Sequence, residues 1–314
     1  MPIADTVAQS SPGAVAEVTI GGVGRRALTV GGAAALPFLK FEGTIPHRPA
    51  IAVDVQDSPP DDWATGVREA WGSAAADPAA WAKAAAVAGA DAIALTLAST
   101  HPDGANASAA SAVATVKRVP NATDLPLIVY GPGVAAKDNE VLVAVAEAAS
   151  GQRLALGMCE DKNYRTIVAA CLAHGHVAVA RSPIDLNLAK QLNILIADMG
   201  LSVDRILMDP TTGALGYGLE YSYSVMERLR LAALQGDKWC ALPMVCTVGY
   251  EAWRQKEAKA VSGVPAEWGD LSRRGVLWEA TTAQALLEAG ADILVMRHPK
   301  AISLVRGTID KLMG

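Results

Sequence analysis

The chain has 314 residues, of which 51% are hydrophobic, with 27 basic and 32 acidic side chains and a formal net charge of −5 at pH 7. This length provides material for a large buried core, and the mildly acidic balance argues against nucleic-acid binding, which needs clustered Lys and Arg. The sequence shows no apolar run long enough to span a bilayer and no signal-peptide pattern, so we expect a soluble cytoplasmic protein without a membrane partner.

Residues 1–49 come before the first long apolar run. Within them, the stretch AVAEVTIGGVGRRALTV (14–30) has two short β-prone segments separated by a glycine-rich turn. We therefore predict an N-terminal β-hairpin that closes one end of the main domain, and we treat residues 1–49 as an extension rather than a domain of their own.

From residue 50 onward, short apolar runs alternate with helical patterns. The runs are nearly continuous, as expected for parallel strands that are covered on both faces. One helical pattern lies between Asp185 and Gly200, and another ends the chain. Eight such runs begin at Ala50, Asp91, Leu125, Arg153, His176, Arg205, Leu242 and Asp292.

Eight strand–helix units in residues 50–314 predict an α/β fold of the (β/α)8 TIM-barrel type with the N-terminal β-hairpin extension. The competing fold is a doubly wound open sheet. That fold is disfavoured because no G-x-G-x-x-G stands between a predicted strand and the helix after it.

Functional sites of TIM barrels lie at the C-terminal ends of the strands. The predicted strand ends carry a polar ring with no evident nucleophile–base pair, no lysine within a strand and no cluster of histidines, so a binding surface is expected rather than a catalytic centre. The ring consists of Asp54, Gln56, Asp57, Thr96, Ser99, Tyr130, Gly131, Glu160, Asn163, Arg181, Ser182, Asp209, Thr247, Glu251, Arg297 and His298.

The stretch DPTTGALGYGLE (209–220) is the most distinctive part of this ring. A strand ends at Asp209, and Gly213, Gly216 and Gly218 precede a helical pattern. Glycines permit close backbone approach, and a helix N-terminus favours electron-rich groups, so the stretch is a candidate ligand contact. The alternative is a strand-to-helix turn that meets no ligand.

Two long segments on the same predicted face, residues 56–81 and 251–275, contain Trp63, Trp71, Trp253 and Trp268. Long connections of this kind are usually functional, and Trp is enriched at protein interfaces, so these four residues are predicted to contact a partner. Alternatively, they fasten their own segments to the barrel.

The four cysteines are isolated from one another and lie in apolar runs. Without a C-x-x-C pair they do not predict a zinc or iron–sulfur site, and we expect structural thiols and no metal bound by this chain. The cysteines are Cys159, Cys171, Cys240 and Cys246.

Four stretches, 31–57, 163–196, 208–238 and 245–258, resemble the small (delta) subunit of the corrinoid/iron–sulfur protein of the acetyl-CoA decarbonylase/synthase system. The resemblance implies a TIM barrel akin to pterin-binding methyltransferases and a heterodimeric methyl carrier without independent catalysis. The large (gamma) subunit would hold the iron–sulfur cluster and the corrinoid (cobalamin), which the small subunit helps to enclose. A methyl-tetrahydropterin methyltransferase would load the methyl group, and acetyl-CoA synthase/carbon monoxide dehydrogenase would receive it, as in the reductive acetyl-CoA pathway.

The resemblance makes part of the ring, together with the glycine-rich stretch, a corrinoid-facing rim. The sequence departs from the family at Leu39-Lys40, where a His often precedes FEG, and at Met158, where an Asn often stands. An autonomous pterin-dependent methyltransferase is the alternative, and the Met158 substitution weakens it. The rim residues are Asp54, Glu160, Asn163, Arg181, Asp209, Thr211, Thr212, Gly213, Gly216, Tyr217, Gly218 and Thr247.

Overall fold

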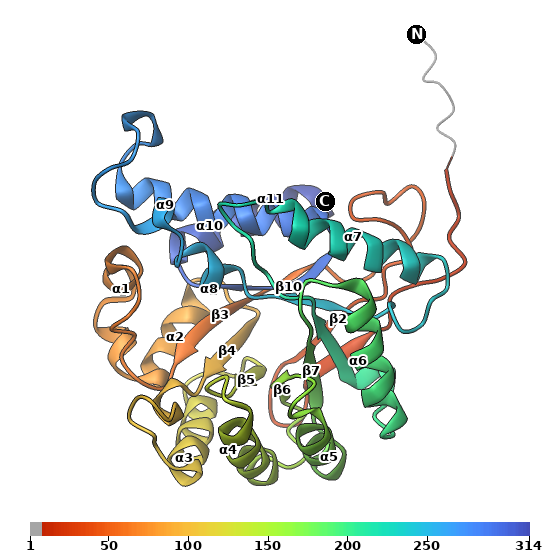
Figure 1. Ribbon diagram of the computed structural model, residues 1–314, viewed down its shortest axis with the longest axis horizontal. Helices are drawn as coiled ribbons and strands as arrows, with labels where there is room; N and C mark the ends of the chain where they lie inside the picture. Colours follow the sequence, from red (N-terminus) through yellow and green to blue (C-terminus); the bar gives the residue numbers. More distant parts are fainter. Residues whose placement is uncertain (1–7) are drawn as a thin grey trace.

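The computed structural model describes residues 8–314 and contains a closed barrel of eight parallel strands, as predicted. The strands follow one another around the barrel in chain order, and the last pairs with the first (Figure 1). They are β3 (Ala50–Gln56), β4 (Ala92–Thr96), β5 (Leu127–Tyr130), β6 (Ala155–Cys159), β7 (Val177–Arg181), β8 (Ile206–Asp209), β9 (Met244–Cys246) and β10 (Ala291–Met296).

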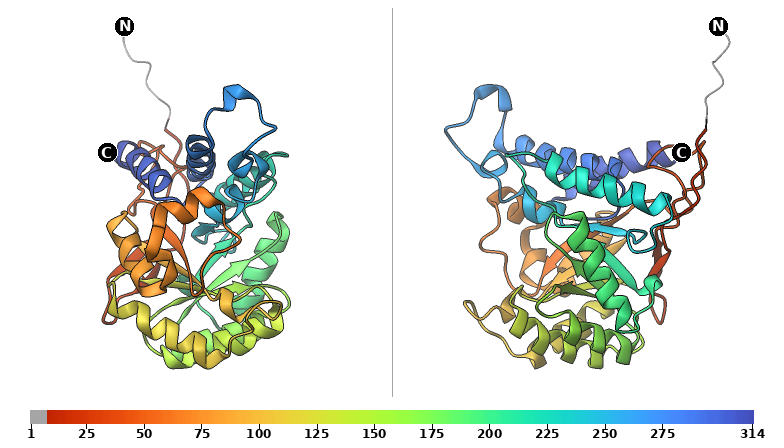
Figure 2. Two further views of the ribbon diagram at one scale, coloured as in Figure 1. Left: turned by 90° about the vertical axis from the view of Figure 1, so that its left-hand side faces the viewer. Right: turned by 45° about the vertical axis from the view of Figure 1, so that its right-hand side comes forward.

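Helices surround the barrel, and the left view of Figure 2 looks onto its C-terminal face. The long connections 56–81 and 251–275 contain helices of their own. The helices are α1 (Thr65–Trp71), α2 (Pro78–Val87), α3 (Ala109–Arg118), α4 (Ala135–Ala148), α5 (Tyr164–His174), α6 (Leu186–Asp198), α7 (Glu220–Leu234), α8 (Val248–Ala252), α9 (Lys256–Lys259), α10 (Leu271–Glu288) and α11 (Pro299–Met313).

Local sequence signals account for the helix boundaries. The Asp185 side chain accepts a hydrogen bond from the Leu188 N–H at 2.9 Å and so caps α6. Helix α11 begins at Pro299, whose missing N–H is no loss at that position, and the His298 ring accepts from the Lys300 N–H. These signals define where α6 and α11 begin, shortly after the ends of β7 and β10.

The predicted hairpin is present as β1 (Val18–Gly21) and β2 (Ala27–Val30), which pair antiparallel. Its apolar side chains, including Val18 and Ile20, are buried together with those that fill the inside of the barrel. Backbone bonds such as Gly21 N–H to Arg153 O, at 2.9 Å, tie it to the strand starts. The hairpin therefore closes the N-terminal end and leaves the other end open.

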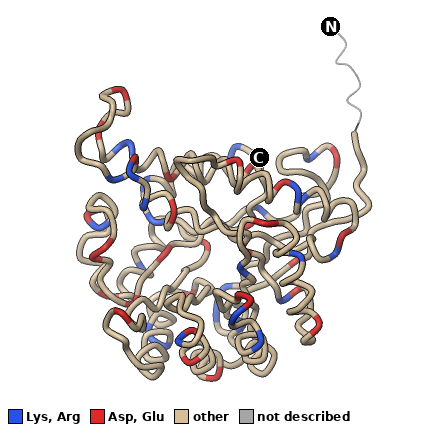
Figure 3. The backbone as a smooth tube through the Cα atoms, viewed as in Figure 1, with Lys and Arg blue, Asp and Glu red and all other residues tan. Residues whose placement is uncertain are grey.

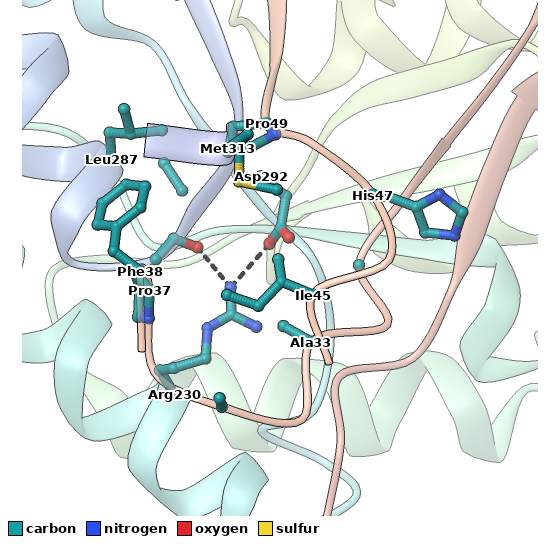
Figure 4. A pocket seen from close by; sticks show the side chains of 14 residues that line it. Ala33, Pro37, Phe38, Ile45, His47, Pro49, Arg230, Leu287, Asp292 and Met313 are labelled. Atoms are coloured by element: carbon teal, nitrogen blue, oxygen red, sulfur yellow. Dashed lines mark hydrogen bonds and ion pairs between the residues drawn. The ribbon is translucent and has the colours of Figure 1, made fainter. Parts of the chain in front are cut away.

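A small cavity of about 30 Å³ also lies at the N-terminal end, beneath residues 31–49 (Figure 4). Arg230 points into it and pairs with Asp292 at 2.8 Å, and Asp292 also accepts from the Met244 N–H at 2.7 Å. The first contact joins helix α7 to the start of β10, and the second joins the starts of β9 and β10. The cavity is therefore part of the packing of the N-terminal extension on the barrel.

Lys and Arg are interspersed with Asp and Glu along the chain (Figure 3). Among residues 8–314, none of the helices combines the length and the hydropathy that a membrane crossing needs.

Candidate functional site

The open end of the barrel contains a cavity of about 150 Å³, which we call the mouth. It is lined by strand ends and by the first residues of the connections after them, where TIM barrels carry their sites. Three of the predicted rim residues, Asp54, Arg181 and Thr247, line it. The other lining residues are Gln56, Thr96, Tyr130, Gly131, Pro132, Gly133, Met158, Tyr250, Val295 and Arg297.

One side of the mouth is built around a buried ion pair. Arg297 Nε donates to Asp54 Oδ2 at 2.8 Å, and the Thr96 hydroxyl donates to Asp54 Oδ1 at 3.1 Å. The Arg297 guanidinium lies over the Trp63 ring, 3.8 Å from its centroid, and over the Tyr250 ring at 5.4 Å. Stacking and pairing together hold this cation in one orientation.

Glu279, a buried residue of helix α10 that the sequence did not single out, holds the backbone of Arg297 in place. Its fully buried carboxylate accepts from the Arg297 N–H at 2.5 Å, the His298 N–H at 3.1 Å and the Trp253 Nε1–H at 2.7 Å. Burial raises the pKa of Glu279 to about 7, although these hydrogen bonds act in the opposite direction. Glu279 thus fixes the end of β10, from which Arg297 enters the mouth.

The opposite side of the mouth is formed by the strand ends of β6 and β7, which contribute Met158 and Arg181, and β8 lies next to β7. Arg181 and Asp209 are partners across these strands. The Arg181 guanidinium contacts Met158 Sδ, and its Nε lies 3.3 Å from the Thr211 hydroxyl and 3.8 Å from the Glu160 carboxylate. It therefore has several weak partners rather than one close ion pair.

Several buried polar atoms at this end have no hydrogen-bond partner within residues 8–314. They are Tyr130 Oη, Ser182 Oγ, Asp209 Oδ2 and Thr212 Oγ1. Buried polar groups are normally paired, so an unpaired set at the open end of a barrel indicates a place for water or a ligand. Burial raises the pKa of Asp209 to about 6, and burial together with the nearby Asp209 carboxylate raises the pKa of Tyr130.

Nine of the twelve predicted rim residues lie outside the cavity lining, and Asn163 and Glu160 are two of them. The Asn163 Oδ1 accepts from the Glu160 N–H at 2.7 Å, and its Nδ2 donates to Met158 O at 3.1 Å. The amide therefore stabilises the turn before α5. The structure does not bring Asp54, Asn163 and Asp209 together as one ligand-binding set.

The glycine-rich segment 211–218 is stabilised largely by its own hydrogen bonds. The N–H groups of Tyr217 and Gly218 donate to Ala214 O, and the Gly213 N–H donates to the Ser222 hydroxyl at 3.0 Å. Gly216 has a φ of 82° and Gly218 a φ of 155°, values that explain both glycines as turn residues. The segment also presents the Tyr217 side chain, which is 92% exposed.

Three of the four tryptophans predicted to contact a partner are buried within this chain. Trp63 and Trp71 pack on Trp81, with ring centroids 5.3 and 6.1 Å apart, and Trp253 stacks on His298 at 5.6 Å. Their burial favours the alternative interpretation, in which these three residues fasten their own segments to the barrel. Trp268, which is 43% exposed, remains available.

No group of three or more His, Cys, Asp and Glu is arranged to hold a metal ion in the part of the chain that the structure describes. The four cysteines are buried and free. Burial raises the pKa of Cys171 to about 12 and that of Cys240 to about 11, so these thiols stay protonated at neutral pH.

The fold is a TIM barrel similar to that of dihydropteroate synthases. The Xanthomonas albilineans enzyme with 4-aminobenzoic acid aligns with a TM-score of 0.61 at 15% identity, over 95% of this chain and 97% of that one. The Thermus thermophilus enzyme aligns with a TM-score of 0.58 at 15% identity, over 94% of this chain and 98% of that one. The chain itself belongs to the CO dehydrogenase/acetyl-CoA synthase delta subunit family, whose model matches residues 17–306.

Relatives of known name agree with this assignment. The Methanopyrus kandleri acetyl-CoA decarbonylase/synthase complex subunit delta is 37% identical over 95% of this chain and 75% of its own length. The Archaeoglobus fulgidus subunit delta is 37% identical over 96% of this chain and 69% of its own length. The Methanosarcina thermophila subunit delta 1 is 38% identical over 94% of this chain and 68% of its own length. The resemblance noted in the sequence is therefore confirmed.

Proposed function

We propose that this chain is the small subunit of a heterodimeric corrinoid/iron–sulfur methyl carrier and that its C-terminal face covers the corrinoid. The large subunit carries the corrinoid and the iron–sulfur cluster. A methyl-tetrahydropterin methyltransferase supplies the methyl group, and acetyl-CoA synthase/carbon monoxide dehydrogenase accepts it. Membership of the delta family over residues 17–306 is the observation that carries the proposal.

The distribution of tyrosines supports a contact at the C-terminal face. All six tyrosines of the chain lie at a strand end, in segment 211–218 or within the early turns of α5, α7 and α8. Tyr217, Tyr221 and Tyr250 are 92%, 62% and 41% exposed. Tyrosine is enriched at interfaces because it combines a large apolar area with a polar tip and few rotatable bonds.

The residues of the mouth fit a corrinoid, which is a large and mostly neutral ligand with amide groups around its edge. Within residues 8–314, Tyr130 has a buried hydroxyl group without a partner, and so does one carboxylate oxygen of nearby Asp209, which is not part of the lining, lack a partner. Thr247 adds a hydroxyl group, and Met158 and Val295 add apolar surface. A bound corrinoid supplies the cobalt that accepts and releases the methyl group. The chain's own residues hold its edge and exclude water, and Tyr217 contacts it or its carrier domain.

The test uses the heterodimer loaded with hydroxocobalamin and follows replacement of the cobalt ligand by cyanide in the visible spectrum. We expect slower exchange in the heterodimer than in the large subunit alone. Tyr217→Ala should speed exchange without changing stability, because the side chain is almost fully exposed. Val87→Ala, an equally exposed residue at the end of α2, is the matched control. Equal exchange with and without this chain would refute the proposal.

An autonomous pterin-dependent methyltransferase is the second candidate, favoured by the fold shared with dihydropteroate synthases, one of which was solved with 7,8-dihydropteroate. The amide of Asn163 is already engaged within its own turn, which disfavours a pterin site. Binding of methyl-tetrahydrofolate to the isolated chain at micromolar concentration would support this candidate.

A further inference from the structure

The mouth combines hydrogen-bond donors and acceptors that the protein does not satisfy. Tyr130, which is 4% exposed and lines the cavity, has a hydroxyl group without a partner, and the adjacent Asp209 has one unpaired carboxylate oxygen. Within residues 8–314, the guanidinium of Arg297 makes one hydrogen bond, from Nε to Asp54. Its two terminal nitrogens are therefore available to a ligand. A group that both donates and accepts suits this set.

The size of the cavity restricts what enters it. A volume of about 150 Å³ holds several water molecules or a chain of a few non-hydrogen atoms. A macrocycle cannot enter, but a side arm at its edge can. Met158 and Val295 would contact the methylene part of such an arm.

The charge of the surroundings favours a neutral group. Arg297 is paired with Asp54, and Arg181 lies near Glu160. The carboxyl group of Asp209 is fully buried and has no close cationic partner of its own. A carboxylate arm would add a negative charge near the unpaired Asp209 carboxyl group at a high desolvation cost, whereas a primary carboxamide donates and accepts without charge.

We infer that one carboxamide arm of the corrin edge inserts into the mouth and hydrogen-bonds to the Tyr130 hydroxyl group. This inference rests on the proposed function, since it names the part of the corrinoid that the chain recognises. The mouth would thereby set the rotational position of the corrinoid on the face of the barrel.

The experiment uses the same heterodimer and the same cyanide exchange, with two changes. The first is Tyr130→Phe, which removes a hydroxyl group that has no partner within the protein and so should not harm folding. Tyr164→Phe is the matched control, because Tyr164 begins α5 on the same face but does not line the mouth. The second replaces cobalamin by derivatives in which a single carboxamide arm is hydrolysed to a carboxylate.

Shielding of the cobalt is measured as the slowing of cyanide exchange by this chain. We expect Tyr130→Phe to speed exchange about fivefold, as the loss of one buried hydrogen bond predicts, and Tyr164→Phe to leave the rate unchanged. One derivative should lose shielding about tenfold or more, while the others behave as cobalamin does. Shielding that is unaffected by Tyr130→Phe and equal for all derivatives would overturn this inference but not the proposed function. Absence of shielding by the wild-type chain would overturn the proposed function as well.

Discussion

The Glu279 carboxylate, on helix α10, accepts a hydrogen bond at 2.5 Å from the backbone N–H of Arg297, the residue directly after strand β10. The same carboxylate accepts from the His298 N–H and the Trp253 indole. The buried carboxyl group of Glu279 on α10 thus holds the strand end that carries the Arg297 guanidinium to Asp54. The mouth depends on this support as well as on the residues that line it.

The raised pKa of Glu279 predicts that stability falls as pH rises. The group binds its proton more tightly in the folded state (pKa about 7) than in the unfolded state (4.5), so its contribution is fully present below pH 4.5 and is lost by about pH 7. At about 1.4 kcal/mol per pKa unit this amounts to roughly 3 kcal/mol.

Urea unfolding between pH 4.5 and 8 measures this effect. Glu279→Gln should flatten the profile, although Asp209 and Asp138, both with pKa values raised to about 6, will leave some slope in the same direction. The exposed Glu288→Gln on the same helix is the control. A profile as steep in Glu279→Gln as in the wild type would contradict the prediction.

Breaking the Asp54–Arg297 pair should be costly. Arg297→Met leaves a buried carboxylate without its cation and should lower the free energy of unfolding by about 3–5 kcal/mol. Arg254→Ala, which removes an exposed pair with Glu251, should cost about 1 kcal/mol or less. Denaturant titration of the two variants tests the difference, and comparable losses would show that the mouth pair is not buried as described.

Two helical glycines predict opposite outcomes for the same substitution. A Cβ at Gly275 in α10 would lie 2.9 Å from Ala258 O and closer still to the Trp253 ring, whereas nothing lies within 4 Å of one at Gly307 in α11. Gly275→Ala should destabilise the chain by about 1–3 kcal/mol. Gly307→Ala should stabilise it by up to about 1 kcal/mol. Thermal unfolding gives both signs, and a neutral Gly275→Ala would show that α10 can move away from Trp253.

The isolated chain should be colourless and free of iron. Its four cysteines are buried and separate, and the structure assembles no group of three metal-binding side chains within residues 8–314. Metal analysis and the visible spectrum of the purified chain provide the test. Stoichiometric iron with a charge-transfer band near that of a cluster would contradict it.

The barrel and its polar ring could be predicted from the sequence. Near-continuous apolar runs such as 91–97 and 292–296 are typical of parallel strands covered on both faces. Eight of them with helices between favour a closed barrel. Once the strands are known, Asp54 and Arg181 must lie at their C-terminal ends. Periodicity therefore determined where the candidate site lies.

Periodicity could also have located Glu279, because it lies among Val276, Ala280 and Ala283 on the buried face of α10. An acidic residue in a helix usually faces solvent, so a buried glutamate such as Glu279 is easily overlooked when residues are judged by type alone. Glu279 binds the backbone N–H groups of residues 297 and 298, which are distant from it in sequence. This contact depends on how α10 packs on β10.

The direction of each side chain was decided by tertiary structure alone. The sequence determined that Trp63, Trp71 and Trp253 lie near the open end, but folding of their segments turned them inward to pack on Trp81, Arg297 and His298. Asn163, likewise, bonds to its own turn. The pattern of apolar residues selects elements and their ends because burial is a local, repeating requirement. Which polar groups meet depends on long-range packing, which periodicity does not encode.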